Sequence, residues 1–156
     1  LVIITNQSGL ARGYFDEATL QQIHQRLLSL LAAEGVRVAG IYHCPHHPEA
    51  NCGCRKPRPG MIYRAAHELS FAPEDAIVFG DKPCDIELGR AVGATTVLVS
   101  TGYGATYQAA GYEADIYAGT LADAADMLLG MDRCPVSPPF VDRRPNGGND
   151  VRLRQR

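Results

Sequence analysis

The stretch AIVFGDKPCD, residues 76–85, joins a short apolar run to a glycine and then to two aspartates, Asp81 and Asp85. A continuous apolar run of this length predicts a strand that is buried on both faces. The residues that follow it, about 84–92, have the pattern of a helix that ends at Gly93. A buried strand that leads directly into a helix is the repeating unit of parallel α/β sheets.

The same unit recurs on both sides of this stretch. Further strands are predicted at residues 1–5, 38–43, 95–99 and, more briefly, 114–117. Helices are predicted after an N-cap at Asp16, over residues 60–69 with Pro59 as a first helical residue, and from a cap at Thr120 through Leu129. We therefore expect an α/β fold in three layers, Rossmann-like, with a parallel sheet covered by helices on both faces.

Charge divides the chain into two parts. Residues 132–156 contain six arginines, three aspartates and four prolines, and are predicted to form a disordered tail behind a domain of residues 1–131. The remainder has nine basic and fourteen acidic side chains, which argues against nucleic acid as a partner. No apolar run reaches the ~20 residues that span a membrane. We expect a cytoplasmic monomer that acts on a small molecule.

Three of the five cysteines lie close together beside two histidines. Cys44, Cys52 and Cys54 fall within eleven residues that also contain His46 and His47. Three thiolates and one imidazole make a closed tetrahedral set, which is typical of structural zinc in a reducing compartment. The spacing is not that of a standard zinc finger, and a loop with free thiols is the alternative.

Polar groups also follow the predicted strands, where parallel sheets bind their ligands. They are Thr5 to Ser8 after the first strand, Arg55 and Lys56 before a helix, and Asp81 to Asp85 after the strand at 76–80. A hydroxyl, a lysine and paired carboxylates suit Mg²⁺-assisted phosphoryl transfer. Each group alone has a simpler explanation as a turn, a solvated surface or a helix cap, so the prediction rests on their joint occurrence.

Longer motifs carry a family resemblance. They read TNQSGLARGYF at residues 5–15, YHCPHHP at 42–48, CGCRKPRPGM at 52–61 and GDKPCD at 80–85. Over about residues 1–130 the chain resembles the heptose bisphosphate phosphatases of the haloacid dehalogenase superfamily. The related histidinol-phosphate phosphatases share the zinc loop but typically differ at Ser8 and lack the second histidine, His47.

The resemblance implies a role for each matched position. Thr5 would donate to a phosphoryl oxygen, Lys56 would neutralise developing charge, and Asp81 would bind Mg²⁺ with Asp85 as support or as a further ligand. Asn6, Gln7, Ser8, Arg55 and Lys82 would line the substrate site. Cys44, His46, Cys52 and Cys54 would hold zinc, with His46 favoured over His47. The implied substrate is a sugar bisphosphate, hydrolysed at its C7 phosphate.

The chain departs from the family in one respect. The superfamily's nucleophile is an Asp-x-Asp pair, and no such pair occurs in the 156 residues. We expect it upstream of Leu1, on a strand between residues 1–5 and 76–80, and we expect the chain as printed to be inactive. The alternatives are a histidinol-phosphate phosphatase and an inactive zinc-binding fragment. For Tyr103 and Tyr107 a surface role is favoured over contact with substrate.

Overall fold

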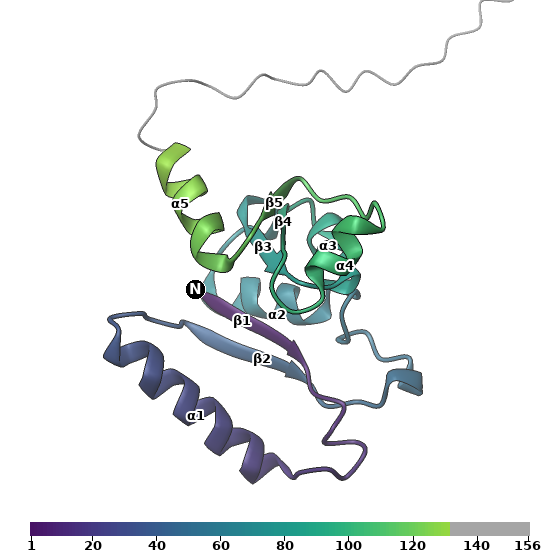
Figure 1. Cartoon of the computed structure of the whole chain (residues 1–156). Helices are drawn as coiled ribbons and strands as arrows, with labels where there is room; N and C mark the ends of the chain where they lie inside the picture. The colour runs from purple at the N-terminus through teal and green to yellow at the C-terminus, as the bar shows by residue number, and fades with distance from the viewer. Residues whose placement is uncertain (132–156) are drawn as a thin grey trace, which may run out of the picture.

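The computed structural model of the chain describes residues 1–131 (Figure 1). Its strands are β1 (Val2–Asn6), β2 (Gly40–Cys44), β3 (Ile77–Gly80), β4 (Thr95–Val99) and β5 (Ile116–Ala118). Its helices are α1 (Glu17–Ala33), α2 (Gly60–Leu69), α3 (Pro83–Ala91), α4 (Gly104–Ala109) and α5 (Leu121–Met131), with short 3-10 turns at Pro48–Ala50 and Pro73–Asp75. The predicted tail at 132–156 lies outside the described residues.

Strands pair only in parallel within the described residues, as the predicted α/β class requires. They form two sheets, however, with β1 beside β2 and with β3, β4 and β5 in that order. Ile3 lies opposite Ile41 in the first sheet, and Phe79 lies opposite Val97 in the second. No described strand lies between β1 and β3, which are not hydrogen-bonded to each other, as expected if the strand of the nucleophile is missing.

The unpaired edges of β1 and β3 can be identified from their neighbours. Main-chain groups of alternate residues point to opposite sides of a strand. The Leu1 carbonyl accepts from Ala39 beside β2, so Val2, Ile4 and Asn6 direct their main-chain groups away from β2. The Ala76 carbonyl accepts from Thr95 beside β4, so Ile77 and Phe79 direct theirs away from β4. Each sheet thus keeps one open edge, on β1 and on β3, as predicted for the two strands flanking the nucleophile.

Local signals explain where the helices start. The Asp16 carboxylate accepts from the Thr19 N–H at 2.8 Å, which satisfies a free donor at the start of α1. Thr120 and Asp123 exchange hydrogen bonds at the start of α5, in the manner of a capping box. Both caps confirm the sequence predictions. The short helix α4 was not predicted, because six residues are too few for a periodic pattern.

Each sheet has its own apolar core. In the first, Tyr42, Cys44, Met61 and Ala65 are buried together where α2 packs on β1 and β2. In the second, the buried residues are Val97, Val99, Ala118 and Ala124. In Figure 1, α1 runs beside β2, on the side of the first sheet away from β3 to β5. No helix within residues 1–131 is both long and apolar enough to cross a membrane.

Candidate active site and metal centre

The segment carrying Lys56 is attached to the end of β1 by Asn6. The Lys56 N–H donates to Asn6 Oδ1 at 3.0 Å, and Asn6 Nδ2 donates back to the Lys56 carbonyl at 3.3 Å. The Lys56 ammonium then donates to the Ile4 carbonyl at 2.8 Å, on the open edge of β1. These three bonds fix the main chain and the charged end of Lys56 beside the first strand.

The same ammonium joins the two sheets. Lys56 Nζ lies 2.6 Å from Asp85 Oδ1, and both side chains are largely buried. Asp85 stands in the first turn of α3 and packs against Gly80, where an added Cβ would lie 2.1 Å from the Asp85 Cβ. Glycine at position 80 is therefore what allows α3 to bring Asp85 over the end of β3. The structure brings Lys56 and Asp85 together across the two sheets.

Asp81 directly follows β3 and accepts a hydrogen bond from the turn that follows β4. Its Oδ2 accepts the main-chain N–H of Tyr103 at 3.0 Å. Gly102 has φ +65°, and a Cβ there would lie 2.3 Å from the same oxygen. Within the described residues no hydrogen bond engages Asp81 Oδ1, so one carboxylate oxygen is available to a ligand. Lys82, the next residue, is exposed and places its ammonium 4.4 Å from the centre of the Tyr103 ring.

The remaining predicted site residues lie at the ends of these segments. Thr5, near the end of β1, accepts a bond from Gln7 Nε2 at 3.1 Å. The Gln7 N–H donates to the Cys44 carbonyl, and the Ser8 carbonyl accepts from Arg12 in the following turn. Arg55 Nη1 is the one fully buried side-chain nitrogen or oxygen in the described part of the chain without a hydrogen-bond partner. A buried guanidinium donor of this kind is costly unless an acceptor reaches it.

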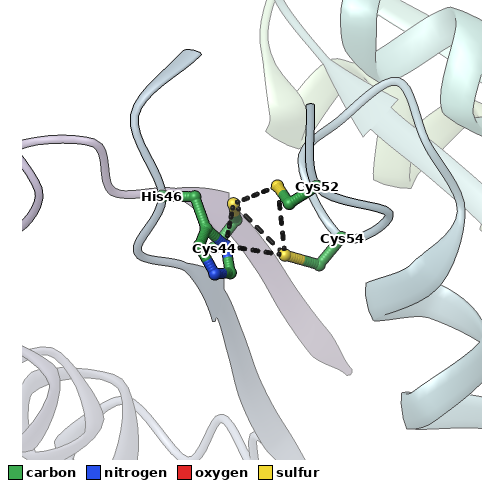
Figure 2. A group of neighbouring side chains, drawn as sticks. All are labelled: Cys44, His46, Cys52 and Cys54. Carbon is green, nitrogen blue, oxygen red and sulfur yellow. Dashed lines mark hydrogen bonds between the residues drawn. The ribbon is translucent and has the colours of Figure 1, made fainter. Parts of the chain in front are cut away.

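Four side chains of the metal loop, residues 44–54, converge (Figure 2). The Sγ atoms of Cys44, Cys52 and Cys54 and the Nδ1 of His46 all lie within 4.8 Å of one another. The close pairs among these four atoms are separated by 3.3 to 3.6 Å. Ligands on a tetrahedron with Zn–S bonds of about 2.3 Å would lie roughly 3.8 Å apart. The cluster is thus slightly tighter than a zinc centre, and it could hold a metal ion.

The neighbouring histidine does not join the cluster. His47 accepts from the Glu49 N–H at 3.5 Å at the start of a 3-10 turn. Cys44 is supplied by β2 and is fully buried, whereas Cys52 and Cys54 come from the loop that leads to Lys56. The cluster therefore ties the loop carrying the lysine to the sheet.

The pKa values of two thiols in this cluster are shifted in opposite directions. Burial acts to raise the pKa of Cys52, but hydrogen bonds from Cys54, Cys44 and the Arg55 main chain lower it to about 6. Burial, and then the adjacent Cys44 and Cys52, raise the pKa of Cys54 to about 12. Deprotonation of Cys52 is therefore favoured, whereas deprotonation of Cys54 is disfavoured. A bound cation stabilises thiolates and would offset the penalty at Cys54.

A cavity separates the two open strand edges. Its volume is about 630 Å³, and its walls are mostly the apolar side chains of β1 and β3, with Lys56 and Asp85 also lining it. A larger and more open hollow of about 880 Å³ lies by Thr95, at the amino end of β4. None of the predicted site residues lines that second hollow. The chemistry-bearing side chains thus gather at the carboxyl ends of the strands, as parallel sheets favour.

Parallel strands with helical crossovers, a lysine paired with an aspartate and a second aspartate after β3 are features that this chain shares with haloacid dehalogenase-like proteins. The family model described as HAD-hydrolase-like matches residues 53–124. The chain is 40% identical over 141 residues to D-glycero-beta-D-manno-heptose-1,7-bisphosphate 7-phosphatase of Photorhabdus laumondii, covering 85% of this chain and 74% of that protein. The chain therefore belongs to the haloacid dehalogenase-like family that includes the heptose 1,7-bisphosphate phosphatases.

Two further relatives support this assignment. The enzyme of the same name from Pseudomonas putida is 46% identical over 104 residues, or 67% of this chain. The chain spans only 59% of the length of that relative. The crystal structure of D,D-heptose 1,7-bisphosphate phosphatase from Bordetella bronchiseptica, complexed with magnesium and phosphate, is similar with a TM-score of 0.79 and 39% identity. That similarity covers 83% of this chain and 74% of the other.

Two contacts of the site were not predicted. The Asn6 clamp on Lys56 joins residues fifty positions apart, and no local pattern announces such a pair. The Tyr103 contacts to Asp81 and Lys82 depend on a turn after β4 whose only sequence signal is the flanking pair of glycines, Gly102 and Gly104.

Proposed function

We propose that these residues form part of a phosphatase that hydrolyses the C7 phosphate of D-glycero-D-manno-heptose 1,7-bisphosphate. Such a reaction belongs to the synthesis of heptose precursors for lipopolysaccharide or related glycans. The observation that carries the proposal is the meeting of Lys56, from the metal loop, with Asp85 and the end of β1. The names of the relatives supply the substrate. Three reduced thiols suit a cytoplasmic enzyme, and we propose a monomer.

The chain's own side chains would hold the transferring phosphoryl group. Thr5 donates its hydroxyl to one phosphoryl oxygen, and the Lys56 ammonium stabilises the charge that develops on the oxygens. Asn6 keeps Lys56 in place through its main chain. Arg55 has a buried Nη1 in need of an acceptor, which a phosphate or a sugar hydroxyl of the substrate supplies. Gln7, Ser8 and Lys82 complete the lining.

Asp81 would hold Mg²⁺, with Asp85 as support or as a further ligand. Carboxylate oxygens are the ligands that this cation prefers, and Asp81 Oδ1 is available while Oδ2 is fixed by Tyr103. Asp85 is already committed to Lys56 through Oδ1. The cation, when bound, neutralises charge on the phosphate. Asp81 therefore makes the stronger ligand of the two.

The cluster of Cys44, His46, Cys52 and Cys54 would bind zinc in a structural role. Its four ligand atoms leave no position for water on a tetrahedral ion. The loop between Cys44 and Cys54 has three residues in a 3-10 turn and few apolar side chains to hold it. Zinc would thus fix the direction in which Arg55 and Lys56 leave the loop.

The nucleophile belongs to an Asp-x-Asp segment that is not among the 156 residues. We assign the strand of this segment to the cavity between the open edges of β1 and β3. The apolar walls of the cavity suit a buried strand. The Lys56–Asp85 pair suits the end of that strand that carries the aspartates. Its first aspartate would attack phosphorus and displace the C7 oxygen of the sugar, which the second aspartate protonates to a hydroxyl. Water would then hydrolyse the aspartyl phosphate and release inorganic phosphate.

Phosphate release from two substrates tests this proposal. The 156-residue chain is compared with an extended chain. The extension precedes Leu1 and consists of an apolar strand that carries Asp-x-Asp, followed by a helix. We expect Mg²⁺-dependent release from the heptose bisphosphate only by the extended chain, and much less from histidinol phosphate. Robust release by the printed chain, or a preference for histidinol phosphate, would contradict the proposal.

Asp81→Asn in the extended chain tests the cation site. An amide is a poor ligand for a hard cation, so we expect turnover to fall by about 100-fold or more, beyond the 10–100-fold lost when a metal's supporting groups are removed. Circular dichroism should remain that of the parent. Activity near the parental level would remove Asp81 from the site.

A further inference from the structure

Tyr103 contacts both charged residues of the loop that follows β3. Its main-chain N–H donates to Asp81 Oδ2 at 3.0 Å, and its ring lies 4.4 Å from Lys82 Nζ. Tyr103 as a residue is 58% exposed, so burial does not account for an aromatic residue at this position. No hydrogen bond engages the Tyr103 hydroxyl within residues 1–131. The main interaction left to the side chain is the one with the lysine.

The backbone on both sides of Tyr103 cannot shift freely. Gly102 has φ +65°, which disfavours any other residue, and Gly104 lies so close to β4 that a Cβ would be 1.8 Å from the Val99 carbonyl oxygen. The turn is therefore seated against Asp81 on one side and β4 on the other. It presents the Tyr103 ring at a fixed place on the rim of the site.

The two lysines of the site have different surroundings. Lys56 is largely buried and bonds to Asp85 and to the Ile4 carbonyl. Lys82 is exposed, and no carboxylate in the described part of the chain lies within ion-pairing distance of its ammonium. An ammonium over an aromatic face keeps its charge and its donors for a further anion. Lys56 thus suits the reacting phosphoryl group, and Lys82 suits an anion at the rim.

We propose that Tyr103 is a specificity-determining residue, which holds the Lys82 ammonium where it binds the second, non-reacting phosphate of a bisphosphate substrate. This inference rests on the proposed function, because it takes a substrate with two phosphates as given. It departs from the surface role that the sequence favoured for Tyr103. The ring acts through Lys82, so it is a positioning residue and touches no reacting atom.

Side-chain substitutions separate this role from the Asp81 contact, which is made by the main chain and survives them. Tyr103→Leu removes the aromatic face, and Tyr103→Phe keeps it. Tyr107→Leu is the matched control, because Tyr107 packs edge-on against Tyr112 instead. The three variants are made in the extended, Asp-x-Asp-bearing chain. They are assayed on heptose 1,7-bisphosphate and on the corresponding heptose 7-phosphate.

We expect Tyr103→Leu to raise KM for the bisphosphate about two- to fivefold, which is what a cation–π contact at an exposed site is worth. Neither kcat nor the KM for the monophosphate should change, and Tyr103→Phe and Tyr107→Leu should behave as the parent. Equal changes with both substrates, a defect in Tyr103→Phe, or an unchanged KM in Tyr103→Leu would each overturn the proposal.

A second readout is independent of turnover. Lysine labelled with ¹³C at Cε should show a ring-current shift of the Lys82 signal in the parent and in Tyr103→Phe, and lose it in Tyr103→Leu. Absence of that shift in the parent would refute the contact on which the inference stands. A parent that shows the shift but releases no phosphate from the bisphosphate would refute the proposed function instead.

Discussion

Helices α1 and α3 of this protein are buried to very different degrees. In the second region, residues 76–131, the nine-residue helix α3 buries Ile86 and Leu88 to 1% exposure or less. In the first region, residues 1–71, the longer helix α1 buries only Leu20, and Ile23 and Leu30 remain about half exposed, at 51% and 50%. Both helices have an apolar face. What differs is whether another part of the chain lies against it.

The width of the two sheets accounts for this difference, because the second sheet has three strands and the first has two. In the second region β3 is paired with β4, and α3 lies against both. In the first region β1 faces the cavity on its far side, so the layer that α1 should cover is narrow. A strand in that cavity, as the proposed function requires, would widen the sheet, and the helix that follows it would lie near α1. The comparison yields four predictions.

Removal of zinc should have the largest effect and should act on the first region. Structural zinc is worth roughly 10–16 kcal/mol in small zinc-finger peptides, an upper limit for a domain with its own core. Metal analysis should find one zinc per chain. Chelation should speed hydrogen exchange in residues 40–58 and leave β4 protected. Cys84→Ser is the control, since Cys84 lies outside the cluster. Metal-free protein, or equal loss of protection in β4, would count against the assignment.

Lys56→Ala should destabilise the junction between the regions. The Lys56–Asp85 pair is the one ion pair in the described part of the chain that joins them. Loss of the lysine leaves Asp85 buried without its partner, which typically costs 3–5 kcal/mol. The double variant Lys56→Met with Asp85→Leu removes both charges and should recover most of that loss. Urea unfolding measures all three proteins, and a double variant no more stable than Lys56→Ala would exclude this explanation.

The same substitution in the two helices tests the comparison most directly. Leu88→Ala in α3 should cost about 2–5 kcal/mol, because it removes a side chain that is buried to 1% exposure. Leu30→Ala in α1 should change stability by only about 0.5 kcal/mol, as at other exposed sites. In the chain extended by the Asp-x-Asp strand and helix, the cost of Leu30→Ala should rise. Equal costs in the printed chain would contradict the difference in burial.

The smallest expected effect is on acid stability in the first region. Hydrogen bonds from Arg64, and then from Tyr42, hold the pKa of Glu68 below its usual value of 4.5. Because the folded-state pKa is depressed, this carboxylate stabilises the fold above the unfolded pKa, and the contribution is lost as pH falls through the folded one. Between pH 5 and 3 the parent should therefore lose slightly more stability than Glu68→Gln. Parallel stability curves for the two proteins would show that the contact is neutral.

Much of the architecture followed from local patterns. The strand at 95–99 and the helix at 60–69 were predicted to the residue, because continuous apolar runs and capped periodic segments carry their own signal. Pro59 was expected as the first helical residue and instead caps α2, a shift of one position. The four members of the Cys/His cluster were also identified from sequence, since all four lie within the eleven residues 44–54.

The sequence by itself determined the class of fold, the family and the types of side chain available for catalysis, because these depend on the order of residues along the chain. Only the tertiary structure decided which of them meet: Asn6 with Lys56, Lys56 with Asp85, and Tyr103 with Lys82. It also decided that α1 stays largely uncovered. Periodicity marks which face of a helix or strand is apolar, but burial and pairing depend on a neighbour from a distant part of the chain.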